Sequence, residues 1–200
     1  MKQSFEYDIA RGVISADGTK KARIERAALT LFAQNGTSTV TTKAIAGAAG
    51  VSEGLIYRHF KNKEALARAL MLAVHQKLTL IIDEAADLPD ISAQIRHITT
   101  QYCEIADSDW MLFRYHILYL HHFSNISEGK GDPLTSTRKL LEAAMARGDI
   151  PTTQDAHILA PMALGVVVQT AQAKVLGYIT APLGDYLDLF VRRIKAVLDV

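Results

Sequence analysis

The stretch from residue 41 to residue 63 constrains the fold most, because it has the pattern of two short helices joined by a tight turn. Its sequence is TTKAIAGAAGVSEGLIYRHFKNK. Thr42 is expected to cap the first helix and Ser52 the second. Gly50 is expected to form the turn, since a residue without Cβ adopts a left-handed backbone at little cost. The pattern predicts a helix-turn-helix, whose second helix can enter the major groove of DNA.

The polar face of this helix pair distinguishes it from the helix pairs of all-α proteins that bind no nucleic acid. Glu53 is the only acidic residue between positions 41 and 63. Hydroxyls, amides and cations near helix N-termini are the groups that bind phosphate oxygens. The face therefore favours DNA binding, and its polar and basic members are Thr41, Thr42, Lys43, Ser52, Tyr57, Arg58, His59, Lys61 and Lys63.

Three segments carry a resemblance to a known family. They are ALTLFAQNG at residues 28–36, TSTVTTKAIAGAAGVSEGLIYRHFKNKEAL at residues 37–66, and within the second the specific run G-x-x-Y-x-H-F-x-x-K at residues 54–63. Residues 20–78 resemble the DNA-binding domain of the TetR (tetracycline repressor) family of transcriptional regulators. The resemblance covers about the first two fifths of the chain.

This resemblance implies roles for single residues. Glu53, Gly54 and Arg58 are expected to face the groove, where Gly54 lets the backbone approach base edges and Arg58 meets guanine or a phosphate. A two-fold dimer presents two such helices, so the expected target is a near-palindromic operator in double-stranded DNA. Lys43 completes the candidate DNA-binding set, and the residues expected to bind phosphates are Thr42, Ser52, Tyr57, His59 and Lys63.

The rest of the chain predicts an all-α fold of about nine helices, because strand patterns are weak throughout. We expect a flexible N-terminal arm at 1–16, a three-helix DNA-binding domain at 17–80, and a helical ligand-binding and dimerisation domain at 81–200. Residues 17–80 carry ten Lys/Arg against four Asp/Glu, whereas residues 81–200 carry ten against fifteen. A basic module joined to an acidic one suits a protein whose N-terminal end alone meets DNA. Besides the helix pair within 41–63, the expected helices lie at about 19–35, 63–86, 91–107, 109–122, 134–147, 153–176 and 181–198, with a loop at 123–133.

The helix expected at 153–176 is apolar on all sides and must therefore be covered on both faces. One face is expected to meet the chain's own core and the other a second subunit, giving a four-helix homodimer interface with the last helix. A wholly internal helix is the alternative. The interface candidates are Ala160, Ala163, Val167, Ala171, Tyr186, Phe190 and Ile194.

The aromatic segment 110–119 is the best candidate for a pocket. In the TetR family a small-molecule effector occupies an apolar cavity of the C-terminal domain and weakens DNA binding, so the resemblance implies such an effector here. Ordinary core packing is the alternative for each residue. His116, Tyr119 and Gln169 favour a mostly apolar effector with one or two hydrogen-bonding groups. The pocket candidates are Tyr102, Trp110, Phe113, His116, Ile117, Tyr119, Met145, Met162, Val166 and Gln169.

Composition and the absence of certain motifs argue against a secreted protein, a membrane protein, a metal-binding protein and an enzyme. The single Cys103 excludes an internal disulfide and fits the cytoplasm. No uninterrupted apolar run reaches membrane-spanning length, and the N-terminus lacks the apolar core of a signal peptide, so no membrane association is expected. No metal-ligand spacing, phosphate-binding Gly loop or catalytic motif occurs. We expect a cytoplasmic repressor released by a small molecule, without cofactor, metal or catalysis; the alternatives are a metal- or redox-responsive regulator of the same fold, or an all-α enzyme.

Overall fold

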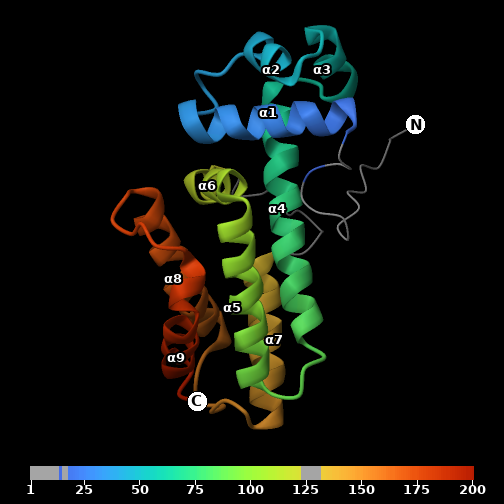
Figure 1. The fold of residues 1–200 in the computed structure, drawn as a ribbon. Coiled ribbons are helices and arrows are strands. Elements are labelled where there is room, and N and C mark those ends of the chain that lie inside the picture. The colour runs from blue at the N-terminus through green and yellow to red at the C-terminus, as the bar shows by residue number, and fades with distance from the viewer. Residues whose placement is uncertain (1–13, 15–17, 123–131) are drawn as a thin grey trace, which may run out of the picture.

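The computed structural model describes residue 14, residues 18–122 and residues 132–200. Within these ranges the chain forms nine α-helices, one 3-10 helix and no strand, which confirms the predicted all-α fold (Figure 1). The expected flexible arm, apart from Ile14, lies outside the described residues, and so does most of the expected loop at 123–133.

The first three helices form a small unit, called here the head: α1 (Lys20–Asn35), α2 (Thr42–Ala49) and α3 (Glu53–His59). Thr19 caps α1, since its hydroxyl oxygen accepts the N–H of Ala22 at 3.0 Å. In Figure 1, α2 and α3 lie above α1, which crosses the upper end of α4. The head contributes to a single buried apolar cluster that continues into the body, and its members there include Ile24, Leu29, Phe32, Val40, Ile45, Ala46, Ile56 and Phe60.

The remaining helices form the body. Asn62 caps α4 and Asp90 caps α5, as each side chain accepts a backbone N–H three residues on. The long helix α4 starts beside the head and runs down into the body, crossing the boundary expected at residue 80 (Figure 1). The body helices are α4 (Lys63–Ala85), α5 (Ile91–Ser108), α6 (Trp110–Tyr119), α7 (Pro133–Arg147), α8 (Ala156–Val175), η2 (Leu183–Tyr186) and α9 (Leu187–Val197).

Three predicted helix starts are wrong, each because a different side chain binds the free backbone N–H groups. Thr41, not Thr42, caps α2, with its oxygen 3.1 Å from the N–H nitrogen of Ala44. The helix expected from residue 153 starts only after Asp155, which caps α8. The last helix, expected from residue 181, begins at Leu187, because the Asp107 carboxylate of α5 holds the preceding segment as a 3-10 turn.

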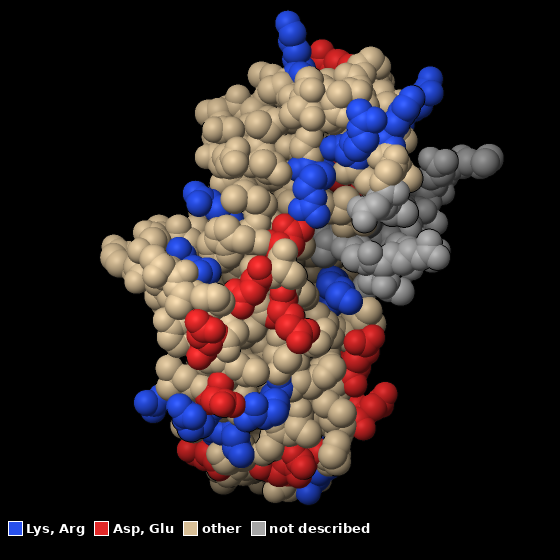
Figure 2. Space-filling view, viewed as in Figure 1, with Lys and Arg blue, Asp and Glu red and all other residues tan. Residues whose placement is uncertain are grey.

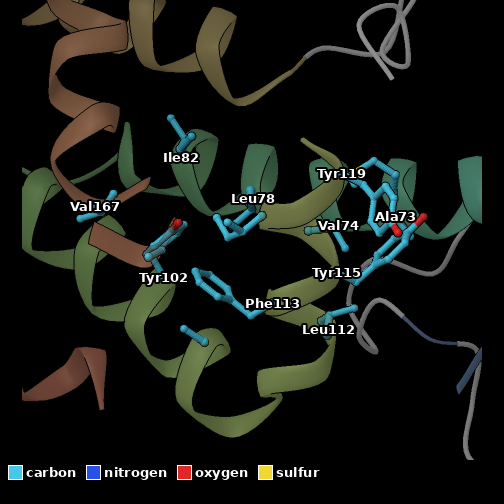
Figure 3. Close-up of a cluster of buried hydrophobic side chains, with 14 of the residues drawn as sticks. Ala73, Val74, Leu78, Ile82, Tyr102, Leu112, Phe113, Tyr115, Tyr119 and Val167 are labelled. Atoms are coloured by element: carbon cyan, nitrogen blue, oxygen red, sulfur yellow. The ribbon is translucent and has the colours of Figure 1, made fainter. Parts of the chain in front are cut away.

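An aromatic cluster joins α5 and α6 to α4 (Figure 3). The rings of Tyr102 and Phe113 meet edge to face at 5.0 Å, and those of Tyr115 and Tyr119 lie 5.0 Å apart. Aromatic pairs at such distances add to the stabilisation that burial alone provides. Most of the predicted aromatic segment therefore belongs to the core that fixes α6 in place.

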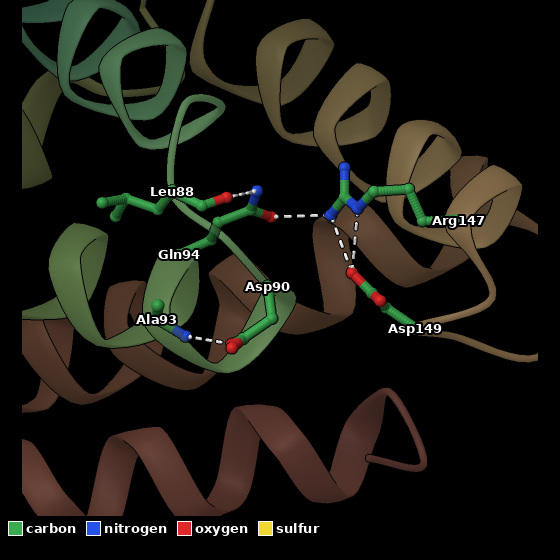
Figure 4. Close-up of polar contacts among 6 residues, drawn as sticks. All are labelled: Leu88, Asp90, Ala93, Gln94, Arg147 and Asp149. Carbon is green, nitrogen blue, oxygen red and sulfur yellow. Dashed lines mark hydrogen bonds and ion pairs between the residues drawn. The ribbon is translucent and has the colours of Figure 1, made fainter.

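A buried amide closes the opposite end of the body (Figure 4). Gln94 of α5 is fully buried, and its Nε2 donates to the Leu88 carbonyl at 3.2 Å. Its Oε1 accepts from Arg147 at 3.4 Å, and Arg147 is paired with Asp149 at 2.8 Å. A buried polar group costs stability unless it is paired, so this network connects α5, α7 and the loop after α4.

Two described helices, α4 and α8, are long and apolar enough to cross a membrane by length and composition, which the sequence analysis did not expect. In α4, 11 of the 23 residues are buried in the core, as expected for a helix that packs against several others. On α8, by contrast, Ile158, Met162 and Leu176 are 59%, 50% and 63% exposed. These three residues, called here the α8 stripe, share one face, because they follow helical spacing.

The residues predicted to form the dimer interface lie elsewhere. Ala160, Ala163, Val167 and Ala171 occupy the inner face of α8, and Phe190 and Ile194 the inner face of α9, all buried within the subunit. Tyr186 is only half-buried. Six of the seven predicted residues are therefore packed inside the subunit, which the sequence could not reveal because an all-round apolar helix carries no periodic signal that separates its two sides.

Candidate nucleic-acid interface and ligand cavity

A left-handed glycine forms the turn between α2 and α3. Gly50 has φ 63° and ψ 42°, as predicted, and the N–H of Val51 donates to the Ala46 carbonyl at 3.0 Å. Arg23 of α1 donates from Nε to the Ala49 carbonyl at 2.9 Å and from Nη2 to the Gly50 carbonyl at 2.7 Å. The sequence analysis missed Arg23, which ties the turn to α1 with charge-assisted hydrogen bonds.

Eight of the nine candidate DNA-binding residues lie on α2, on α3 or in the turn between them, at the end of the head away from the body (Figure 1), and the ninth, Lys63, begins α4. Lys43, Ser52, Gly54, Tyr57 and Arg58 are exposed. Figure 2 shows Lys and Arg side chains projecting from the head, whereas Asp and Glu lie chiefly over the body. The other four candidates are half-buried: Thr42, Glu53, His59 and Lys63.

A hydrogen-bonded group joins α2 to α3 on this face. The Thr42 hydroxyl donates to the Glu53 carboxylate and lies 3.2 Å from the Tyr57 hydroxyl. The hydrogen bond from Thr42 thus holds the Glu53 side chain of α3 against α2. The arrangement fixes the Tyr57 ring at the edge of α3, where it remains 52% exposed.

Lys63 contacts the head rather than solvent alone. Its Nζ donates to the Val40 carbonyl at 2.8 Å and to the Ser38 carbonyl at 3.4 Å. These carbonyls belong to the loop between α1 and α2. The side chain predicted to bind a phosphate therefore also closes this loop, a role that the motif alone does not reveal.

Replacing Lys63 with methionine is expected to lower the free energy of unfolding by about 1 kcal/mol, because the charge-assisted bonds to the two loop carbonyls are lost. Urea denaturation followed by circular dichroism measures the change. Lys61 is exposed and is the matched control, so Lys61→Met should change stability by less than about 0.5 kcal/mol. Equal effects of the two substitutions would show that the loop contacts contribute nothing.

The body contains a cavity of about 610 Å³ between α4, α5, α7 and α8. Only Tyr102 and His116 of the ten predicted pocket residues line it. His75, Leu78 and Ile82 line it from α4, at a helical spacing that could have identified them in the sequence. The other predicted residues do not line it: Trp110, Phe113, Ile117, Tyr119, Met145, Met162, Val166 and Gln169.

The misplaced pocket residues have other contacts. Trp110 stacks on Phe113 at 5.9 Å and lies under the Lys174 ammonium. Tyr119 turns toward the head, and Met162 and Gln169 lie on the exposed side of α8. An aromatic segment shows that a region is packed, but the neighbouring helices decide which of its faces borders a cavity.

Three polar side chains in the cavity wall are left without partners. The rings of His75 and His116 lie 5.5 Å apart. Both nitrogens of His75, Nδ1 of His116 and the Tyr102 hydroxyl have no hydrogen-bond partner within the described part of the chain. Burial, and secondarily the neighbouring His75, lowers the pKa of His116 to about 3. Burial also lowers the pKa of His75 and raises that of Tyr102, so all three groups are uncharged at neutral pH.

Two observations bear on the metal- and redox-responsive alternatives. No group of three or more His, Cys, Asp or Glu side chains suited to a metal lies within residues 18–122 and 132–200. Cys103 is buried, and burial, together with Asp107 and Glu104, raises its pKa to about 11. Since the thiolate is the reactive form of cysteine, this thiol is held in its unreactive state.

Helix α6 connects the cavity wall to the head. His116 faces the cavity, while Arg114 on the same helix donates to the Ala33 carbonyl of α1 at 3.1 Å. The Tyr119 hydroxyl accepts the N–H of Thr37 at 2.9 Å, and the Tyr115 hydroxyl donates to the Ala67 carbonyl at 2.8 Å. At the start of α6, Asp109 pairs with Arg26 of α1 at 2.6 Å. A shift of α6 would therefore pull on α1 and α4 together.

Sequence comparison matches the head to a known family. The family described as "Bacterial regulatory proteins, tetR family" matches residues 24–70. The uncharacterized HTH-type transcriptional regulator YvkB of Bacillus subtilis is 37% identical over 78 residues, which span 39% of this chain and 40% of that protein. The sequence match to this curated relative thus covers less than half of its length.

Comparison of folds extends the likeness to the body. The transcriptional regulator FadR from Bacillus subtilis, solved in complex with stearoyl-CoA, aligns with a TM-score of 0.76 at 20% identity, over 86% of this chain and 96% of that one. SmeT, the repressor of the Stenotrophomonas maltophilia multidrug efflux pump SmeDEF, aligns with a TM-score of 0.72 at 23% identity, over 90% of each chain. Residues 24–70 of this chain thus match the TetR family of bacterial regulatory proteins in sequence, and the chain as a whole is similar in fold to these two solved regulators.

Proposed function

We propose that this protein is a sequence-specific transcriptional regulator that binds a near-palindromic operator as a homodimer and leaves it when a small molecule fills the body cavity. The helix-turn-helix carries the proposal, because eight of the nine candidate residues lie on α2, on α3 or in the turn between them, within the region whose sequence matches the family. The relative YvkB is described as an HTH-type transcriptional regulator and SmeT as a repressor, which supports repression here. We further propose that the protein is soluble, resides in the cytoplasm and requires no cofactor.

The proposed DNA contacts divide between groove and backbone. A Cβ at Gly54 would meet no atom within 4 Å, so the chain's own packing does not require glycine there. A close approach of the α3 backbone to base edges would explain why position 54 is a glycine. Arg58 is exposed beside Gly54 and is proposed to meet a base edge, while Tyr57 and Lys43 are proposed to bind phosphates.

The α8 stripe is proposed as the centre of the dimer interface. Large exposed apolar side chains along one helix face mark an interaction surface on a soluble protein. A second copy of α8 packed on this stripe would bury it and place the two heads on the same side of the dimer. Such an isologous interface is the commonest arrangement in homo-oligomers.

The proposed release mechanism depends on α6. A ligand shifts an equilibrium only if it binds one conformation more tightly than the other. Ligand in contact with His116 would favour the position of α6 that accommodates it, and the bonds from Arg114, Tyr115 and Tyr119 would carry that displacement to α1 and α4. The separation of the two heads would then no longer match the operator.

Selection of bound sequences from a random DNA pool tests the function, and a near-palindrome should be recovered. On that operator, Arg58→Ala is expected to lower affinity on the order of tenfold and to relax the preference at one position of each half-site. Tyr57→Ala should weaken operator and random DNA alike, because a phosphate contact carries no sequence information. Fluorescence anisotropy against both DNAs measures the affinities.

Lys139→Ala, an exposed change on α7 in the body, is the matched control for a lost positive charge and should change neither affinity. Retention of full operator affinity and sequence preference by both the Arg58 and Tyr57 variants would contradict the assigned DNA-binding face.

A further inference from the structure

The polar cluster of the cavity specifies the chemistry of the ligand. We infer that the effector is an uncharged, mostly apolar molecule whose one hydrogen-bonding end lies between His75, Tyr102 and His116. This inference rests on the proposed function, since it assigns a chemical class to the effector of the same cavity.

The size and walls of the cavity define most of the ligand. A volume of about 610 Å³ is within the range of pockets that hold drug-sized molecules. The walls supplied by α4, α5, α7 and α8 are largely aliphatic, with Leu78 and Ile82 on one side and Leu140 and Val167 on others. Most of a bound molecule would therefore contact only hydrocarbon, which favours an apolar body.

The unpartnered groups define one polar end. His116 and Tyr102 are almost completely buried, yet the Tyr102 hydroxyl and Nδ1 of His116 have no hydrogen-bond partner among the described residues. A neutral imidazole offers one donor and one acceptor, and a phenol can do both. A hydroxyl, carbonyl or amide on the ligand can satisfy such a set. Buried polar groups are normally paired, so these atoms indicate where a partner binds.

The charges on the described lining residues disfavour an ionic end. No Lys or Arg occurs among the described lining residues, and the only carboxylate in that set is Asp132. A ligand carboxylate would thus be buried without a counter-ion, which is strongly unfavourable. A ligand cation would have only Asp132 as a counter-ion in this set, and its Oδ1 and Oδ2 already accept the N–H and hydroxyl of Thr135 at 3.0 and 2.7 Å, which leaves fewer acceptor sites for the ligand.

Three probes of equal chain length test the inference: 1-decanol, decanoate and decylammonium, each titrated calorimetrically into the full-length protein at pH 7.5 below micelle-forming concentrations. We expect the dissociation constant of 1-decanol to be at least about tenfold lower than those of the two ions. Decanoate or decylammonium binding as tightly as the alcohol would overturn the inference, and so would the absence of binding by all three probes.

Two conservative variants locate the polar end. Tyr102→Phe removes one hydroxyl from the cavity wall and should weaken 1-decanol about fivefold, the effect of one neutral hydrogen bond. Tyr178→Phe removes a hydroxyl from a ring that is 82% exposed outside the cavity and should leave binding unchanged. Equal affinities of the Tyr102 variant and the parent would overturn the placement.

Operator binding is measured separately, on protein without probe. Tight alcohol binding by a protein that ignores every DNA would support the ligand class and refute the proposed function. Operator binding combined with a preference for decanoate would support the proposed function and refute the ligand class.

Discussion

Replacing Ile158 and Met162 together with aspartate is expected to convert the protein to a monomer and to weaken its binding to a palindromic operator at least about a hundredfold. The reason is the geometry of the α8 stripe, in which both side chains are exposed on one face. Two charges cannot be buried there without partners, so a second subunit can no longer pack on this face. A monomer then loses the avidity of two linked heads, which contributes a factor of about 10² to 10⁴.

Sedimentation velocity gives the oligomeric state, and gel shift on operator DNA gives the affinity. Leu118→Asp is the matched control, because Leu118 is an exposed apolar residue on α6 outside the stripe. It should leave the protein dimeric. A dimeric Ile158/Met162 double variant with full operator affinity would show that the subunits meet elsewhere.

Acidification from pH 7 to pH 5 is expected to lower the free energy of unfolding by about 2 kcal/mol through His116 alone. Burial lowers the folded-state pKa of this residue to about 3 from the ordinary value of 6.5. Between these two values the unfolded chain binds a proton that the native protein does not, so stability falls as the pH drops through 6.5. His75, whose pKa is also lowered, adds to the loss in the same direction.

Urea denaturation at pH 7 and pH 5 measures this loss in the parent and in two variants. His116→Gln should flatten the pH dependence, although the variant is less stable at both values, since the titrating group is gone. His157→Gln, at an exposed site on α8, should keep the slope of the parent. An unchanged slope in the His116 variant would assign the acid sensitivity to other groups.

Local sequence patterns predicted the helix-turn-helix well, because short-range chemistry decides it. A left-handed turn at position 50 requires glycine, and Asn62 caps α4 with its side chain. Ser52 stands at the predicted start of α3, but its side chain forms no cap hydrogen bond there. The same patterns predicted the all-α class and the number of helices in the described part of the chain. They failed at Thr41 and Thr42, where two adjacent residues of one type could each cap α2.

Contacts between distant segments were beyond such patterns. Arg23 binds the turn 26 and 27 residues away, and Lys63 closes a loop more than 20 residues earlier. Neither partner follows from local spacing. The pocket prediction failed for the same reason, since His75, Tyr102 and His116 come from three helices whose relative rotation only packing sets.

The sequence by itself therefore determined the class of fold, the helix-turn-helix and its match to the TetR family over residues 24–70, since each depends on residue types at short, regular spacings. The tertiary structure alone decided which face of α8 is exposed, which residues enclose the cavity, and how α6 joins that cavity to the head. Those features depend on the rotation of each helix about its own axis, which is set by the summed packing of all its neighbours.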